Sequence, residues 1–146
     1  SATSREALAQ TVRVAAQDDS ALHVVHIYDN PWHGMPRSDI VTANMPDFDT
    51  KLAQSVEQRL REFCEPLAHE MNALKAQYHG FQHDELWEGH GSGITGFIAS
   101  HGIDLAVLGV RSTWSARDFF MGSTAERVCR DAGCSILTVR PVPDLK

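Results

Sequence analysis

The strongest fold signal lies in residues 104–139, which read DLAVLGVRSTWSARDFFMGSTAERVCRDAGCSILTV. A short apolar segment ends at Gly109, a polar loop extends to Met121, and the residues that follow have helical spacing up to Gly133. A second short apolar segment, Ser135 to Val139, closes the stretch. The succession of strand, helix and strand predicts two parallel strands connected by a helix, the repeating unit of an α/β fold.

The first half of the chain shows the same alternation. Thr3 and Glu6 have the spacing of a capping box, which predicts a helix at the start. His23 to Tyr28 predicts a strand covered on both faces. The proline-containing segment from Asn30 to about Phe48 predicts a long loop, either a binding element or a surface loop of no special role.

The middle of the chain predicts the longest helix. Apolar residues recur every three or four positions from Leu52 to Leu74, Pro66 predicts a kink, and Gly80 is interpreted as the stop signal. A strand around residues 85–88 and a short helix ending at Gly102 complete the pattern. Neither an internal repeat nor a linker is visible, so residues 1–146 are predicted to form a single domain.

Composition excludes several classes of protein. The 146 residues are 42% hydrophobic and 22% charged, which is typical of a globular chain rather than a disordered one. A net charge of −6 disfavours binding to DNA, RNA or anionic lipid, and no segment has the apolar length of a membrane span or the pattern of a signal peptide. Three cysteines without a CxxC pair indicate buried, reduced thiols, and a cytoplasmic location is expected.

A candidate anion site lies where the strand ending at Gly109 leads to the helix that opens at residues 122–124. The first turn of a helix offers unpaired amide donors and a positive field, and glycine lets a ligand approach the backbone. The alternative is structural: Ser123 and Glu126 form an ordinary capping box, and Gly109 is a turn residue. Arg111 and Arg117 either pair with phosphate or are solvated.

The eight histidines do not form a recognisable metal site. None has the HExxH spacing or belongs to a cysteine-containing ligand set, and His23 and His26 point to opposite faces of their strand. No metal ligand is therefore expected. No catalytic nucleophile is assigned either, because His90 and Ser92 lack an orienting third group.

The same stretch resembles the nucleotide-binding signature of the universal stress protein family, which is Gly, two residues, Gly, nine residues, Gly, then Ser or Thr. Here it reads Gly109-Val110-Arg111-Ser112, nine residues to Met121, and Gly122-Ser123. The resemblance continues through residues 125–128 and 134–141 and covers nearly the whole chain. One departure is Ser112, which replaces the second glycine of the signature.

The resemblance implies a Rossmann-like open parallel sheet with strand order 3-2-1-4-5. Residues 1–8 align with the loop and helix that follow the family's first strand. The central first strand would then be missing from this sequence, together with its acidic nucleoside contact. Because a parallel sheet cannot leave unpaired backbone at its centre, we expect either a longer natural chain or a strand from another copy.

The resemblance also implies the ligand and its contacts. The expected cofactor is ATP or AMP, with or without magnesium. Carried over by motif position, Ile27 flanks the adenine, Leu108 and Gly109 line the ribose and phosphate side, and Arg111 pairs with phosphate charge. The phosphates are surrounded by Ser112, Gly122, Ser123 and Thr124.

These expectations lead to two alternative functions. The first is a stress-response regulator that binds adenine nucleotide and is at most a slow ATPase. The second is an interaction module without nucleotide, whose partner contacts the loop of Trp32 or that of Trp114. In either case the resemblance implies a homodimer through the last strand, Ser135 to Val139, and we expect no nucleic-acid or membrane partner.

Overall fold

A computed structural model describes residues 1–29, 47–83, 89–110 and 121–140. In chain order its elements are α1 (Ala2–Asp18), β1 (His23–Asp29), α2 (Phe48–Cys64), the 3₁₀ helix η2 (Glu65–Leu67), α3 (Ala68–Ala73), β2 (Gln77–His83), α4 (Gly89–His101), β3 (Leu105–Gly109), α5 (Ser123–Asp131) and β4 (Ser135–Val139). The predicted α/β class is confirmed, and the strands pair in parallel.

The described strands form two sheets, one of β1 with β2 and one of β3 with β4. In the predicted order 3-2-1-4-5, in which the missing strand is number 1, they would be the outer pairs 3-2 and 4-5. The complete order and the missing central strand stay predictions. The chain divides into two compact units, one with α1, α4, β3, α5 and β4 and the other with β1, α2, η2, α3 and β2, and each is described by itself. A single domain over residues 1–146 also stays a prediction.

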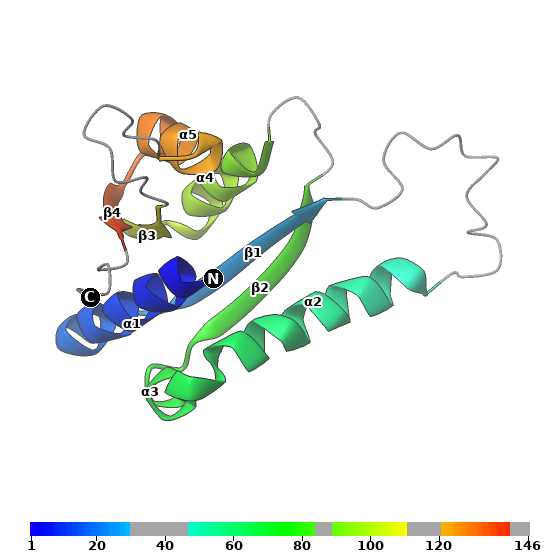
Figure 1. Cartoon of the computed structure of the whole chain (residues 1–146), viewed down its shortest axis with the longest axis horizontal. Coiled ribbons are helices and arrows are strands. Elements are labelled where there is room, and N and C mark those ends of the chain that lie inside the picture. Colours follow the sequence, from blue (N-terminus) through cyan, green and yellow to red (C-terminus); the bar gives the residue numbers. More distant parts are fainter. Residues whose placement is uncertain (30–46, 84–88, 111–120, 141–146) are drawn as a thin grey trace, which may run out of the picture. The chain divides into compact units, whose positions relative to one another are not determined.

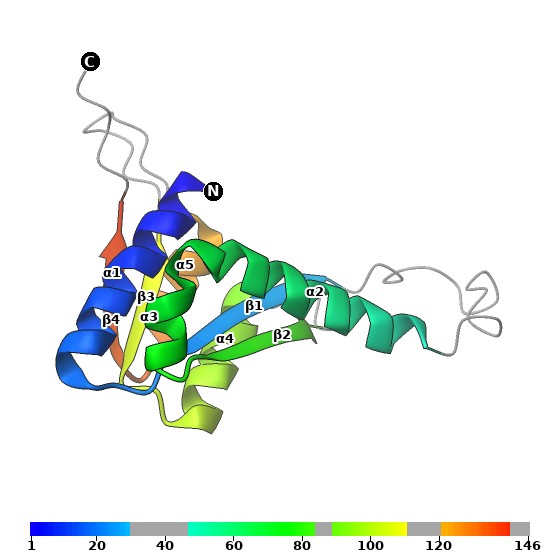
Figure 2. The same ribbon diagram turned by 90° about the horizontal axis from the view of Figure 1, so that it is seen from below.

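The first unit begins with α1, whose cap differs from the predicted one. Ser1 is the N-cap, and its hydroxyl accepts a hydrogen bond from the Ser4 amide at 3.2 Å. The expected capping box of Thr3 and Glu6 is therefore wrong, because Thr3 already lies inside the helix. The inner face of α1 buries small apolar side chains, including Val12, and the helix packs along β3 and β4 (Figure 2).

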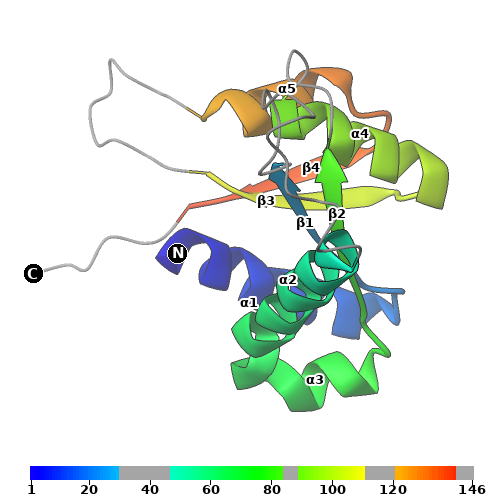
Figure 3. The same cartoon turned by 90° about the vertical axis from the view of Figure 1, so that its right-hand side faces the viewer.

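The sheet of this unit is a regular parallel pair. Its register runs from Leu105 opposite Ser135 to Gly109 opposite Val139. Hydrogen bonds from the Ser135 amide to the Asp104 carbonyl (3.1 Å) and from the Val110 amide to the Val139 carbonyl (2.9 Å) extend the ladder at both ends. Helices α4 and α5 pack against each other (Figure 3), with Gly91 leaving room for the side chain of Arg127.

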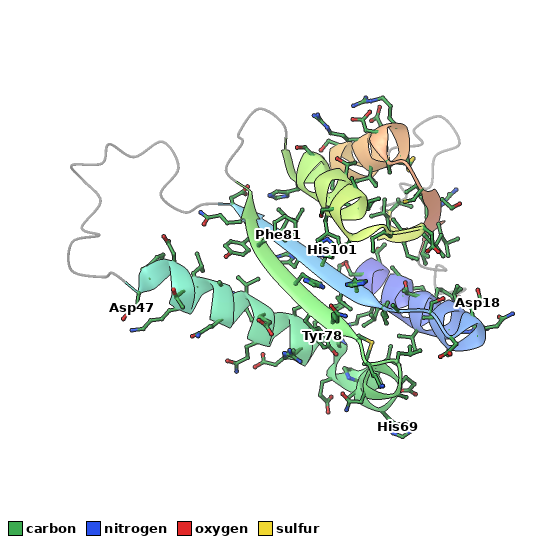
Figure 4. The ribbon with its side chains drawn as sticks, turned by 180° about the vertical axis from the view of Figure 1, so that it is seen from behind. Asp18, Asp47, His69, Tyr78, Phe81 and His101 are labelled. Atoms are coloured by element: carbon green, nitrogen blue, oxygen red, sulfur yellow. The ribbon has the colours of Figure 1, made fainter. Side chains whose placement is uncertain are left out.

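The second unit consists of the β1–β2 pair with α2 along one face (Figure 1). Gly80 identifies that face, because a Cβ there would lie 2.9 Å from Cγ1 of Val56 on α2. Tyr78, labelled in Figure 4, points the same way: its ring centroid lies 4.4 Å from the guanidinium carbon of Arg61. Tyr28 lies on the same face, and its pKa is raised mainly by burial and secondly by the nearby Asp49 carboxylate.

Two expectations for this region need correction, the end of the long helix and the role of Gly80. The long helix is broken where Pro66 lies in η2, which confirms a disruption at that proline, and it ends before Lys75 rather than at Gly80. Lys75 has a left-handed backbone with φ of 50°. Gly80 belongs to β2, a strand that the sequence did not predict, whereas the strand expected at residues 85–88 falls outside the described residues.

The cysteines are all free, as expected, but only Cys64 is buried. Cys129 is exposed on α5, so its predicted burial is wrong. Helix α4 begins at Gly89, earlier than its apolar residues indicated. Among the residues that the structure describes, no helix has the length and apolarity needed to cross a membrane.

Candidate functional site

The candidate site is formed by the carboxyl end of β3 and the first turn of α5. Because β3 and β4 are parallel, the intervening α5 must run in the opposite direction to both. The amino end of α5 and the carboxyl end of β3 therefore lie at the same end of this unit (Figure 3). Ligands of open parallel sheets bind at this end of the strands.

The first turn of α5 has no side-chain cap among the described residues, because a glycine occupies the N-cap position. Gly122 is the N-cap, with φ of 89° and ψ of 145°, a conformation that favours glycine. No side chain among the described residues caps the helix, and the Glu126 amide bonds to the Gly122 carbonyl at 2.9 Å. The expected capping box of Ser123 and Glu126 is therefore wrong, because Ser123 is already the first helical residue.

This opening gives the first turn the properties of an anion site. The amides of Ser123, Thr124 and Ala125 precede the first intrahelical bond and point outward from the helix end. They lie at the positive end of the helix dipole, where negative charge is stabilised by about 0.3–1 kcal/mol. The exposed Glu126 carboxylate in the same turn would repel an anion, so an anion bound here would have to be held by the amides rather than by net charge.

Gly109 has a different role from the predicted turn. A Cβ on Gly109 would lie 2.9 Å from Thr3 Cγ2, 3.1 Å from the Thr3 carbonyl oxygen and 3.3 Å from its carbonyl carbon. Glycine is therefore needed for the close approach of α1 to β3, and its φ is not left-handed. This contact also brings the start of α1 to the end of the unit where β3 ends.

The remaining predicted residues divide into three groups. Leu108 on β3 and Thr124 are half-buried, and Ser123 is exposed. All three lie in the same unit as Gly109 and Gly122. Ile27 is buried on β1 in the other unit, with 7% of its surface exposed. The predicted contacts Arg111 and Ser112, as well as Arg117, Trp32 and Trp114, lie outside the described residues.

Catalytic chemistry has little support in the described part of the chain. Ser100 Oγ lies 2.9 Å from His101 Nδ1, but both atoms also lie 3.1 Å from the Phe97 carbonyl oxygen, at the end of α4. The contact therefore belongs to a helix terminus. Within residues 1–29, 47–83, 89–110 and 121–140, no group of three or more His, Cys, Asp or Glu side chains could hold a metal ion.

Sequence reasoning missed the part that Thr3 takes in this site. Its contact with Gly109 joins residues more than a hundred positions apart, and Thr3 had been interpreted as a cap. The available signal was Gly109 itself, because a glycine at a strand end indicates either a turn or a close backbone approach. Only the position of α1 distinguishes the two.

Comparison with known proteins gives the following matches. The sequence profile of the universal stress protein family matches residues 1–140. Among solved structures, the chain is similar to the universal stress protein UspA from Lactobacillus plantarum, with a TM-score of 0.63, 18% identity and coverage of 94% of this chain and 90% of that one. It is also similar to a protein from the universal stress protein family from Burkholderia pseudomallei, with a TM-score of 0.56, 20% identity and coverage of 94% of this chain and 87% of that one. No curated protein sequence gives a significant match.

Proposed function

The chain belongs to the universal stress protein family, and we propose that it is a stress-response domain that binds an adenine nucleotide, ATP or AMP, where β3 ends and α5 begins. One observation carries the proposal: α5 starts behind a left-handed Gly122 without a side-chain cap, next to the carboxyl end of a parallel strand. An uncapped helix start in this place offers amide donors to phosphate.

In this proposal each residue acts by binding rather than by chemistry. The amides of Ser123 and Thr124 hold phosphate oxygens, and Leu108 and Gly109 line the ribose side. Ile27, in the other unit, and Arg111 and Ser112, outside the described residues, stay predicted contacts that the family resemblance alone supports. Magnesium, if bound with the nucleotide, would neutralise part of the phosphate charge. The nucleotide then biases conformation or assembly, and any hydrolysis is slow.

Calorimetric titration with ATP, with and without magnesium, and with AMP tests the proposal. Ser123→Glu places a carboxylate at the proposed phosphate site while suiting the helix dipole, so the fold should be retained. A like charge about 8 Å from a phosphate costs about 2 kcal/mol at an effective dielectric constant of about 20. This corresponds to a loss of affinity of more than about tenfold.

Thr50→Glu is the matched control, because Thr50 is exposed in the first turn of α2 and the charge change is the same. This variant should bind nucleotide as the wild type does. Equal affinity in the S123E variant and the wild type, or the absence of any heat at millimolar ATP, contradicts the proposed site.

The second candidate function is an interaction module that binds no nucleotide. It is favoured by the contact between Gly109 and Thr3, because packing alone accounts for this glycine of the signature. This function predicts that the wild type gives no binding heat with ATP or AMP. It also predicts that self-association is independent of nucleotide.

We further propose that the chain forms a homodimer through the edge of β4 that faces away from β3. The backbone hydrogen bonds of Ser135 and Val139 show that the amides and carbonyls of the odd-numbered residues of β4 point toward β3. The amides and carbonyls of Ile136 and Thr138 therefore point away from β3, and Leu137 is 37% exposed. A second copy that pairs with this edge satisfies those groups.

Multi-angle light scattering at micromolar concentration tests the dimer. Thr138→Pro removes an outward amide without removing a bond to β3, so the variant should be a folded monomer. Thr138→Val keeps the amide and should remain a dimer. A monomeric wild type, or a dimer that persists in the T138P variant, contradicts the proposal.

A further inference from the structure

Two histidines from neighbouring strands meet on one face of the β1–β2 sheet. His23 Nδ1 lies 3.0 Å from His79 Nε2, and the ring centroids are 5.2 Å apart with planes inclined by 31°. The register places His23 opposite Gln77 and Val25 opposite His79, so the two histidines are diagonal neighbours on the same face. This is the face away from α2, because Gly80, the next residue on β2, faces Val56.

The position of the pair combines a fixed backbone with access to solvent. Both residues lie within the continuous parallel ladder of β1 and β2 rather than in a loop. Both side chains are half-buried, so a small ion and water molecules can reach the rings. Strand pairing holds the two Cα atoms in place, which reduces the entropy lost when both rings bind one ligand.

The facing nitrogens are close enough to bind one metal ion together. Imidazole nitrogens bind divalent metal ions at about 2.0–2.1 Å. Nitrogens 3.0 Å apart then subtend an angle of about 90° at the ion, the angle between neighbouring ligands in square-planar or octahedral sites.

We propose that His23 and His79 form a binding site for a divalent transition-metal ion, of which Cu²⁺ and Ni²⁺ fit best. Square-planar or tetragonal coordination by nitrogen and oxygen is typical of these two ions, and Cu²⁺ binds most tightly in the divalent series. The other coordination positions are filled by water, since the described residues offer no third ligand from His, Cys, Asp or Glu.

Metal binding replaces the proton that the two rings share. In the hydrogen-bonded neutral pair, one of the facing nitrogens carries a proton and the other accepts it. The donor ring changes tautomer, moving its proton to its other nitrogen, so the neutral pair releases no net proton. One ring also turns about χ2, a soft torsion, so that both lone pairs point at the ion.

Copper titration of the untagged protein near neutral pH, followed by electron paramagnetic resonance, tests the site. The first equivalent of Cu²⁺ should show coupling to two imidazole nitrogens. In the His23→Gln and His79→Gln variants, the spectrum should show coupling to one imidazole nitrogen fewer. Each variant should also bind copper at least about tenfold more weakly, because the loss of an outer-shell partner of a metal site already has an effect of that size. His26→Gln is the matched control, since His26 is exposed on the same strand with its side chain on the opposite face. This variant should bind copper as the wild type does.

A second measurement on the wild type does not depend on whether the variants fold. Substoichiometric Cu²⁺ should broaden the amide NMR signals around positions 23–25 and 78–80 before any others. First-equivalent binding that is unchanged in both the H23Q and H79Q proteins overturns the proposal. Broadening that begins at another histidine overturns it as well.

Discussion

Replacing Gly109 with alanine tests the packing that positions the candidate site. The new Cβ would lie 2.9 Å from Thr3 Cγ2 and 3.1 Å from the Thr3 carbonyl oxygen. The methyl group can turn aside, but the carbonyl moves only if α1 moves. Overpacking of this kind costs about 1–3 kcal/mol. Alanine stiffens the unfolded chain and offsets about 0.4–1 kcal/mol, so the free energy of unfolding should fall by about 1–2 kcal/mol.

Urea unfolding followed by circular dichroism measures this change. Gly96→Ala is the matched control, because Gly96 is exposed within α4 and a Cβ there meets nothing within 4 Å. It should raise the free energy of unfolding by about 0.5–1 kcal/mol. Adding Thr3→Ser to the G109A variant removes the nearest contact and should recover part of the loss. If the G109A and wild-type proteins are equally stable, α1 does not constrain Gly109 and the reasoning fails.

Two further substitutions, a rise in pH and a thiol reagent have expected outcomes. Gly122→Ala should cost about 1–3 kcal/mol by backbone strain alone, because φ is 89° and no atom lies within 4 Å of the new Cβ; unfolding at wild-type urea concentrations would contradict this. Gly80→Ala should destabilise through the 2.9 Å contact with Val56, and the additional change Val56→Ala should restore part of the stability, as a double-mutant cycle can measure. Burial raises the pKa of the Cys64 thiol above its ordinary 9.0. The folded state therefore holds this proton more tightly than the unfolded state, and stability should fall as pH rises above about 9. A thiol reagent should modify exposed Cys129 in the folded protein and reach Cys64 only on unfolding; early modification of Cys64 would show that it is accessible.

The elements that the sequence predicted best are those with self-contained signals. β4 has the predicted bounds, and β1 and β3 differ from theirs by one residue, because each is a short apolar run between turn or loop residues. Pro66 disrupts its helix for a reason that is local to the backbone, the missing amide donor. These features depend little on the rest of the fold.

The strand β2 could not be predicted in the same way. Its sequence, QYHGFQH, has no aliphatic residue and contains a glycine that resembles a helix stop. The glycine is there because Val56 on α2 leaves no room for a side chain, a contact between elements that are distant in sequence. The His23–His79 pair was missed for the same reason, because it can be predicted only when β2 and its pairing with β1 are known.

The two elements of the candidate site were predicted, but the residue that caps α5 was not. Spacing and resemblance identified the end of β3 and the start of α5, which the structure places at one end of a unit. The expected Ser123 cap was wrong because Gly122 takes the N-cap position with φ of 89°. Local sequence cannot reveal this choice, since Ser123 and Glu126 have the spacing of a capping box.

Amide NMR spectra recorded during a titration with ATP and magnesium test the central claim most directly. If nucleotide binds at the uncapped start of α5, the signals of Gly122, Ser123 and Thr124 should shift first and saturate together with the binding heat. Signals in the first turn of α2 should not move. Saturating ATP that leaves the three α5 amides unchanged, or that shifts only residues elsewhere, would contradict the proposed nucleotide site.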